Sequence, residues 1–162
     1  MTRHASFPPV VDTDTETLIL GSLPGAASLA AGRYYAHPRN QFWRLVGAAI
    51  GVDLSALDYD ARLATLTAHR IGLWDVIADA ERSGSLDAAI RNHAANDLTA
   101  LVTSLPHLRT VAFNGGTSAR IGTAQLGDLG DRLRLLRLPS SSPAHAVPFE
   151  AKLAAWQALS SH

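Results

Sequence analysis

One stretch of the chain gathers residue types that together could hold a flat, polar ligand. Residues 21–43 read GSLPGAASLAAGRYYAHPRNQFW and follow a short apolar run. The glycines allow the backbone to approach a ligand closely, and Tyr34 and Tyr35 offer flat faces for stacking. The imidazole of His37 and the carboxamide of Asn40 can donate and accept hydrogen bonds. The stretch is therefore predicted to form one wall of a binding site.

The elements that must position these residues alternate between strand and helix. Apolar runs predict strands over residues 17–21, 71–77, 110–113 and 132–138. Helical spacing and capping residues predict helices over 38–50, 86–92, 97–104, 118–126 and 148–159, the second capped by Ser85 and the third by Asn96. The alternation is typical of an α/β three-layer α-β-α sandwich around a mostly parallel four-stranded sheet.

Four polar turns, at residues 22–25, 74–75, 114–116 and 140–145, fall at the carboxyl ends of the predicted strands. The carboxyl ends of parallel strands meet at one edge of a sheet, and ligands of such folds bind there. We therefore expect these four turns to converge on one site. Asp75, at the second turn, could orient water, accept from a ligand N–H, or cap a helix.

Three motifs carry a resemblance to a known family. GSLPG is similar to the Gly-x-Asn-Pro-Gly loop of mismatch-specific uracil/thymine DNA glycosylases, and AHPRNQFW is similar to their Ala-His-Pro-x-Asn-x-Phe-Trp run. LPSSSPAHA resembles the Pro-Ser loop with which the uracil-DNA glycosylase superfamily presses into DNA. The chain most resembles the hypoxanthine (deoxyinosine) DNA glycosylase branch, over roughly residues 17–156. The first two motifs are specific, whereas LPSSSPAHA alone is a weak signal.

The resemblance implies a monofunctional DNA glycosylase of base excision repair. Such an enzyme flips a deaminated base out of DNA and hydrolyses its N-glycosidic bond. Hypoxanthine is the favoured base, and uracil is allowed because both bases carry the same carbonyl and N–H pair. The absence of a lyase step is inferred from Lys152, the one lysine, which we place far from the motifs on the last predicted helix.

The resemblance also assigns roles to individual residues. Leu23 stands where the superfamily usually carries a catalytic Asn or Asp, so the water-positioning role passes to Asn40, with His37 beside it. The residues expected to bind the base are Ser22, Leu23, Pro24, Gly25, Tyr35 and Asn114. The residues expected to contact DNA are Ser140, Ser141, Ser142, Pro143 and His145.

Each of these residues also has a structural interpretation. Tyr34 is expected to pack on the core, His37 could cap a helix, and Asn114 could merely form a turn before two glycines. Three other functions stay open: a uracil or mismatch glycosylase, a lesion-binding module without chemistry, and a small-molecule hydrolase. The hydrolase would pair a serine of the 140–142 run with His145, although no Gly-x-Ser-x-Gly elbow is present.

Composition narrows the classes of protein. A length of 162 residues favours a single domain, placed at 17–162 after a flexible arm at 1–16. The absence of cysteine excludes cysteine-ligated iron–sulfur and zinc sites. No metal or nucleotide cofactor is expected, no run is long enough for a membrane span, and a cytoplasmic monomer is the default. Net charge is zero and thirteen of the fourteen cations are arginine, which leaves DNA binding open.

Overall fold

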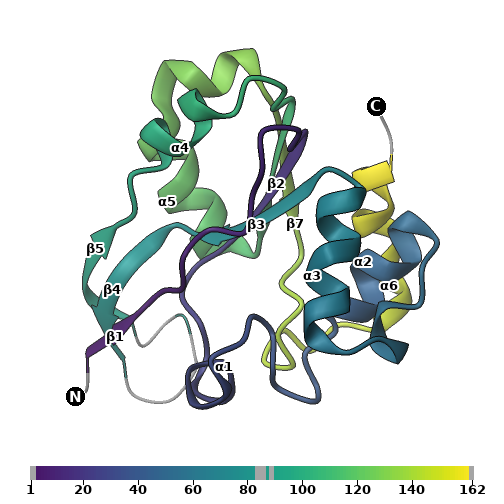
Figure 1. The fold of residues 1–162 in the computed structure, drawn as a ribbon. Coiled ribbons are helices and arrows are strands. Elements are labelled where there is room, and N and C mark those ends of the chain that lie inside the picture. The colour runs from purple at the N-terminus through teal and green to yellow at the C-terminus, as the bar shows by residue number, and fades with distance from the viewer. Residues whose placement is uncertain (1–2, 83–86, 88–89, 161–162) are drawn as a thin grey trace.

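The computed structural model describes residues 3–82, 87 and 90–160. Its centre is a four-stranded parallel sheet in the order β3-β2-β6-β7 (Figure 1). The strands are β2 (Thr17–Gly21), β3 (Ile71–Asp75), β6 (Thr110–Asn114) and β7 (Arg134–Leu138). The predicted parallel sheet is confirmed, and each strand lies within two residues of its expected bounds.

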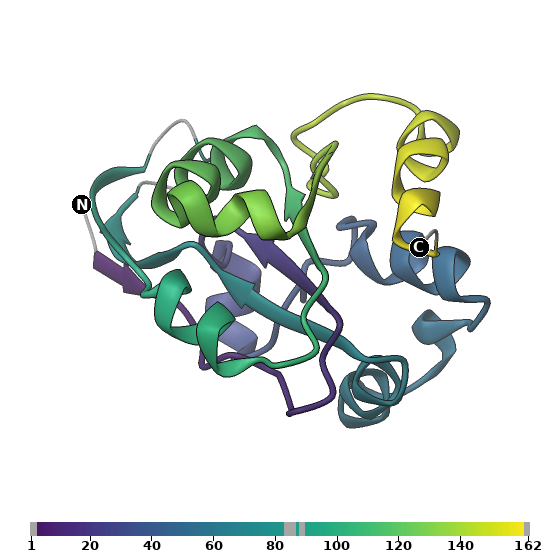
Figure 2. The ribbon, with the colours of Figure 1, turned by 90° about the horizontal axis from the view of Figure 1, so that it is seen from above.

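Helices cover both faces of this sheet, as Figures 1 and 2 show. One face carries α2 (Phe42–Ile50), α3 (Tyr59–Ala68) and α6 (Phe149–Trp156), and the other carries α4 (Leu98–Ser104) and α5 (Gly116–Leu126). Shorter helical segments are α1 (Ala26–Ala31), η1 (Leu54–Ala56), η3 (Gly127–Arg132) and η4 (Gln157–Ser160). The predicted three-layer sandwich is therefore confirmed.

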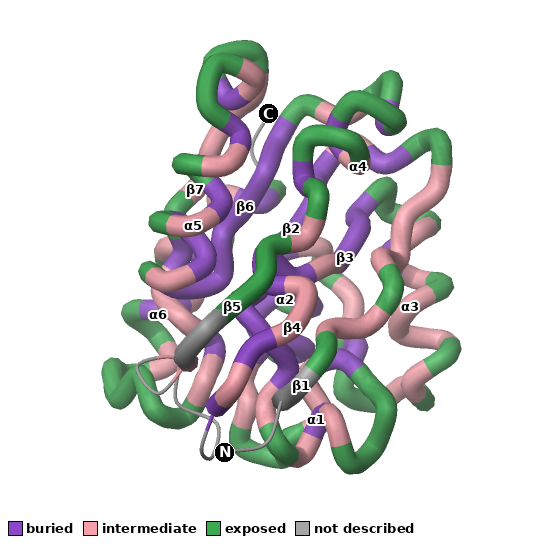
Figure 3. Tube along the Cα trace, turned by 90° about the vertical axis from the view of Figure 1, so that its left-hand side faces the viewer, coloured by how far each residue is buried: buried purple, intermediate pink, exposed green. Residues whose placement is uncertain are grey.

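The central strand β2 is buried along its whole length (Figure 3). Its side chains divide between two cores. Ile19 packs into the core beneath α2 and α6, whereas Leu18 and Leu20 pack into the core beneath α4 and α5. Alternate residues of a strand point to opposite faces, so a strand covered on both faces is apolar at successive positions. This explains the apolar run Leu18–Ile19–Leu20 that leads into the glycine turn.

The structure also contains a second, smaller sheet that the sequence did not predict. It consists of β1 (Arg3–Ala5), β4 (Ile77–Glu81) and β5 (Arg91–Ala95), in the antiparallel order β1-β4-β5. The helix predicted over 86–92 is wrong at residues 91 and 92, which begin β5, whereas Ser85 and residues 86, 88 and 89 lie outside the described residues. The chain leaves β3 and pairs again at once, and β4 supplies the partner that draws residues 91–95 into a strand.

The described part of the N-terminal segment does not stand away from the domain as a loose arm. β1 pairs with β4, Val10 exchanges backbone hydrogen bonds with Leu73, and Trp74 Nε1 donates to the carbonyl oxygen of Phe7 at 3.0 Å. These bonds fix residues that composition alone marked as flexible. The domain boundary at residue 17 stays a prediction.

Two helix starts also need correction. The helix predicted from Pro38 begins at Phe42. Residues 37–40 form a turn instead, in which the backbone N–H of Asn40 donates to the carbonyl oxygen of His37, and Asn40 Oδ1 accepts from the N–H of Phe42. Asp97, and not Asn96, caps α4 by accepting from the backbone N–H of Ala100 at 3.0 Å. Asn96 instead donates to the carbonyl oxygens of Asp75 and Ile77, and so holds the chain where it leaves β3.

Candidate active site

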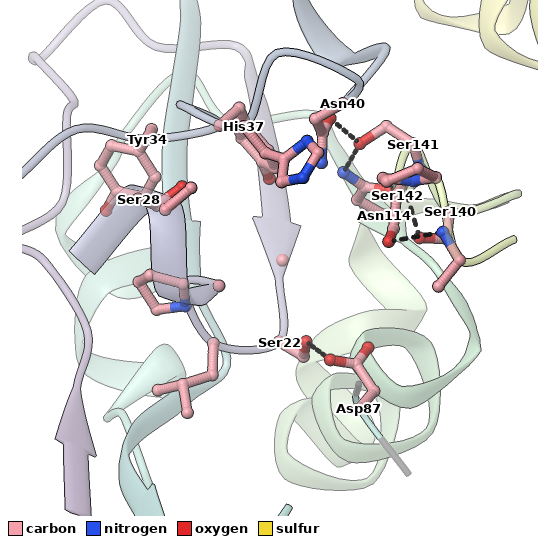
Figure 4. A pocket seen from close by; sticks show the side chains of 18 of the residues that line it. Ser22, Ser28, Tyr34, His37, Asn40, Asp87, Asn114, Ser140, Ser141 and Ser142 are labelled. Atoms are coloured by element: carbon pink, nitrogen blue, oxygen red, sulfur yellow. Dashed lines mark hydrogen bonds between the residues drawn. The ribbon is translucent and has the colours of Figure 1, made fainter. Parts of the chain in front are cut away.

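The four polar turns converge at the carboxyl edge of the sheet, where they surround a cavity of about 430 Å³ (Figure 4). Its walls come from the turn after β2, the segment before α2, the ends of β3 and β6, and the loop after β7. Every residue predicted for the site lines this cavity: Ser22, Leu23, Pro24, Gly25, Tyr35, His37, Asn40, Asn114, Ser140, Ser141, Ser142, Pro143 and His145. Their convergence is a finding, and their chemical roles stay predictions.

Ser141 joins two of the walls through a chain of hydrogen bonds (Figure 4). Its backbone N–H donates to Asn114 Oδ1 at 2.9 Å, and its hydroxyl oxygen accepts from Asn114 Nδ2 at 2.9 Å. The hydroxyl then donates to Asn40 Oδ1 at 2.8 Å. Ser141 is 1% exposed, so this chain is shielded from water and fixes the Pro-Ser loop against the segment before α2.

These bonds also fix the orientation of the Asn40 amide. Its Oδ1 accepts from the hydroxyl of Ser141 and, at 3.0 Å, from the backbone N–H of Phe42. Both donors require an oxygen at that position, so the NH2 group occupies the other end of the amide. No acceptor for this NH2 is found among the described residues. Asn40 therefore offers the cavity a donor, whereas the sequence suggested that its oxygen would accept from a water.

Asn114 is bonded to the loop. Both ends of its buried carboxamide are bonded to Ser141. These bonds use one N–H and one lone pair of the amide, so its expected pairing with a base stays a prediction. Gly115, the next residue, has a φ of 101°, a conformation that glycine adopts without strain. The structure thus favours a role for Asn114 in holding the Ser140–Ser142 run in place.

His37 lies beside Asn40 on the same wall (Figure 4). Its Nδ1 accepts from the backbone N–H of Arg39 at 3.0 Å. His37 thus stabilises the turn before α2, whereas the structural role expected from the sequence was a helix cap. An acceptor at Nδ1 places the proton of the neutral imidazole on Nε2. The side chain is exposed and lines the cavity, so His37 can serve both the turn and a ligand.

Tyr35 is held as a rigid plate. Its ring stacks on Phe42 with centroids 3.8 Å apart and planes at 13°, and its φ of 53° is unusual for a residue other than glycine. Tyr34 is 4% exposed and donates to the carbonyl oxygen of Pro8 at 2.9 Å, so its expected core role is confirmed. Because Phe42 already fixes the Tyr35 ring, the ring loses little conformational freedom when a ligand stacks on it.

Asp75 was named from the sequence but its environment was not foreseen. It ends β3 directly beside Gly21 and is 4% exposed. Burial, followed by the nearby charge of Asp87, raises the pKa of its carboxyl group to about 7, although Arg82 opposes the rise. A Cβ atom at residue 21 would lie 2.6 Å from Asp75 Oδ1, so only glycine leaves room for this carboxyl.

Asp87 is a site residue that the sequence did not reveal. It lines the cavity and accepts from the Ser22 hydroxyl at 2.6 Å. Arg82 is 2% exposed, lies 3.7 Å from Asp87 and donates to the carbonyl oxygen of Pro24. Burial lowers the pKa of Arg82 and raises that of Asp87, and each charge opposes the shift of the other. A Ser-Asp pair across 65 residues carries no local sequence signal.

The position of Lys152 corrects the sequence analysis. We expected this lysine far from the motifs, yet its Nζ donates to the carbonyl oxygen of Ser142 at 3.2 Å. It is 1% exposed, and burial lowers its pKa. It does not line the cavity but packs behind the loop, because the first turn of α6 folds back under residues 140–147.

The loop itself supports no serine nucleophile. The Ser141 hydroxyl is bonded to Asn40 and Asn114, and the Ser140 and Ser142 oxygens accept from backbone N–H groups of the loop. His145 is exposed and makes none of these bonds. The hydrolase hypothesis therefore lacks its base.

Two further properties bear on the class of protein. No helix within the described ranges is both long and apolar enough to cross a membrane. Among the same residues, no three His, Cys, Asp or Glu side chains gather as they would around a metal ion.

Comparison with known proteins gives consistent matches. The sequence profile of the uracil DNA glycosylase superfamily matches residues 8–160. The hypoxanthine DNA glycosylase of Methanosarcina barkeri is 41% identical over 154 residues, which cover 95% of this chain and 96% of that protein. The protein of the same name from Methanosarcina acetivorans is 41% identical over 156 residues, or 96% and 97% of the two chains. The solution NMR structure of a candidate uracil DNA glycosylase from Methanosarcina acetivorans superposes with a TM-score of 0.87 at 40% identity, covering 98% of this chain and 96% of that one.

Proposed function

Because this chain belongs to the uracil DNA glycosylase superfamily, we propose that it is a DNA glycosylase that removes hypoxanthine from deoxyinosine. It extrudes the nucleotide from the duplex and hydrolyses the N-glycosidic bond, with uracil as a second substrate. The observation that carries the proposal is the single cavity in which the strand-end turns bring a fixed aromatic plate together with two hydrogen-bond donors. Two relatives named for hypoxanthine, at 41% identity, favour that base.

In this proposal the extruded base enters the cavity and lies against Tyr35. The turn of Ser22, Leu23, Pro24 and Gly25 lines the same cavity. The stacking of Tyr35 on Phe42 holds the plate in position before the base arrives. A base that stacks on a fixed ring gains about 1–3 kcal/mol, which offsets part of the cost of leaving the duplex.

Bond cleavage leaves positive charge on the sugar and negative charge on the departing base. Donors placed where negative charge develops lower the barrier. The NH2 group of Asn40 and the Nε2–H of His37 are such donors on the wall of the cavity. We propose that Asn40 also holds the attacking water, through its NH2 and not its oxygen. The water then attacks the cation-like sugar, and the proton that it releases ends on the departing base, which leaves as neutral hypoxanthine.

The loop after β7 is the proposed contact with the DNA backbone. Its small side chains and two prolines make a stiff edge at the mouth of the cavity, and Lys152 adds a buried positive charge behind it. Pro143 and His145 are exposed, and so is Val147, the one large apolar side chain that the described residues leave open to solvent. We therefore propose both His145 and Val147 as candidates to fill the gap left in the base stack.

A substrate panel tests the function. The protein is incubated with duplexes that carry one deoxyinosine, deoxyuridine or deoxyxanthosine, and abasic sites are then cleaved with alkali. Strand breaks at deoxyinosine, with free hypoxanthine recovered, are the expected result. Breaks only at deoxyuridine would favour a uracil or mismatch glycosylase, and tight binding without breaks would favour a lesion-binding module.

Replacing Tyr35 with alanine should weaken both binding and rate. Loss of a stacking partner worth about 1–3 kcal/mol predicts an affinity for a deoxyinosine duplex that is roughly 10- to 100-fold lower. Tyr35→Phe keeps the ring and should bind nearly as the parent does. Equal affinities of Tyr35→Ala and the parent, measured by fluorescence anisotropy, would remove the ring from base binding.

The enzyme should act without a covalent lyase step. Lys152 does not line the cavity, and its amine is held by the carbonyl oxygen of Ser142. Sodium borohydride should therefore trap no protein–DNA adduct during turnover of a deoxyinosine duplex. A trapped adduct that disappears in Lys152→Met would show that the loop opens and that the enzyme is bifunctional. We expect the protein to act as a monomer in the cytoplasm.

A further inference from the structure

Asp75 is the least explained group of the cavity. It lines the wall, yet its Oδ2 is buried and has no hydrogen-bond partner in the described part of the chain. A buried carboxylate without partners is costly, whereas the neutral acid is tolerated far better. The group is not a helix cap, because it ends β3 and lies beside Gly21.

The surroundings shift the equilibrium of Asp75 toward its protonated form by raising its pKa. The ionisable groups that face it are Asp87, Arg82, Tyr34 and Tyr35. Asp87 repels a second negative charge, and the two tyrosines stay neutral because burial raises their pKa. Arg82 is the one opposing charge, and it is directed to the carbonyl oxygen of Pro24 and to Asp87.

We propose that Asp75, in its neutral form, recognises the carbonyl and N–H edge of the extruded base. The carboxyl O–H donates to the ring carbonyl, and the carboxyl C=O accepts from the neighbouring ring N–H. Rotation about the soft terminal torsion of the side chain can present both oxygens to the cavity. The inference rests on the proposed function, and it names the group that reads the edge shared by hypoxanthine and uracil.

The two carboxamides of the cavity are each partly used by hydrogen bonds within the protein. Asn114 would be the expected carboxamide, but both ends of its amide are bonded to Ser141. Asn40 presents only its NH2 group, and so can donate but not accept. Asp75 is the remaining side chain at the strand ends with a donor and an acceptor that no other described residue uses.

The sign of the pH dependence separates this role from general-base catalysis. A carboxylate has no proton to donate to the carbonyl, so recognition is lost as the pH rises through the pKa of about 7. From about pH 6 to about pH 8.5 the neutral fraction of such a group falls roughly 30-fold. A general base would give the opposite profile, because the carboxylate would then be the active form.

The test measures the rate of excision from a deoxyinosine duplex at subsaturating protein. Under this condition the pH dependence of the rate reports ionisation in the protein before it binds DNA. The parent rate should fall roughly 30-fold over that range. Asp75→Asn, whose amide keeps a donor and an acceptor at any pH, should stay within about threefold of the parent at pH 6 and lose the dependence. The control is Asp128→Asn, an exposed carboxylate outside the cavity, which should keep the parent profile.

A second measurement does not need catalysis. Affinity for a duplex that carries uncleavable 2′-fluoro-arabino-inosine should fall with rising pH in the parent but not in Asp75→Asn. Affinity for 1-methylinosine, which lacks the N–H, should be low at every pH.

The outcomes distinguish the two proposals. Excision with a rate that is flat or rises with pH would overturn the role of Asp75 and leave the glycosylase proposal intact. So would excision with Asp75→Asn as slow as Asp75→Ala. No excision of any base, with the pH-dependent affinity retained, would overturn the function but support the reading of the edge.

Discussion

Asn40→Ala should lower the single-turnover rate of hypoxanthine excision by roughly 10²-fold or more, the effect of removing one positioned donor near developing charge. The variant loses the NH2 group that faces the cavity, and it also frees the Ser141 hydroxyl and the Phe42 N–H. Binding of the duplex should be largely kept, because Tyr35 still stacks on Phe42 and Asn114 still holds the loop through its two bonds to Ser141. Quench-flow or manual single-turnover assays with excess protein measure the rate.

A matched variant separates the donor from the scaffold. Asn40→Asp keeps an oxygen for Phe42 and Ser141 but removes the NH2 group. If the donor carries the rate, Asn40→Asp should be about as slow as Asn40→Ala while its melting temperature stays near that of the parent. A rate within a few-fold of the parent for Asn40→Ala would remove Asn40 from the chemistry, whereas such a rate for Asn40→Asp alone would contradict the donor role of the NH2 group.

Gly21→Ala is the second change with a large expected effect. A Cβ atom at residue 21 would lie 2.6 Å from Asp75 Oδ1 and 3.1 Å from Tyr35 Oη. Both side chains must move, and displacement of a reacting geometry by about 1 Å can cost about 10² in rate. The excision rate should therefore fall roughly 10²-fold.

Gly72→Ala is the control for this prediction. Gly72 lies on the neighbouring strand, and its added Cβ would be almost as crowded, 2.7 Å from Val11 Cγ1. Its contacts are with the N-terminal segment and not with the cavity. It should lower the melting temperature but leave the rate of the folded fraction near that of the parent. If both variants lose rate equally, the effect of residue 21 is one of stability alone.

The sequence predicted the frame of the site because its signals are local. Residues 18–20 are apolar without alternation, as a strand buried on both faces requires, and a polar turn falls at the carboxyl end of each of the four strands. Once the sheet is parallel, these turns must meet at one edge. The wall around Tyr35 and Asn40 could therefore be predicted before any coordinates were known.

The hydrogen bonds within the site could not be predicted in this way, because they join residues far apart in the chain. Ser141 orients Asn40 across 101 residues, and Ser22 pairs with Asp87 across 65. Neither spacing follows any periodicity, so the donor face of Asn40 and the role of Asp87 emerged only from the fold.

The remaining errors of the sequence analysis have the same cause, because they also concern contacts that form only when the chain folds. Lys152 was judged by its distance from the motifs in sequence, whereas the loop and the first turn of α6 bring it to the carbonyl of Ser142. Asp75 carried no signal of its burial, which depends on Gly21 of the adjacent strand. The second sheet was missed because β5 acquires its extended form from pairing with β4.

The most direct test of the account is a crystal structure of Asn40→Ala bound to a duplex that carries one deoxyinosine. The account predicts a hypoxanthine ring in the cavity, stacked on Tyr35 with its carbonyl and N–H edge at Asp75, and DNA phosphates against Ser140 and Ser142. An inosine that stays stacked in the duplex, or an extruded base bound away from Tyr35, would contradict it.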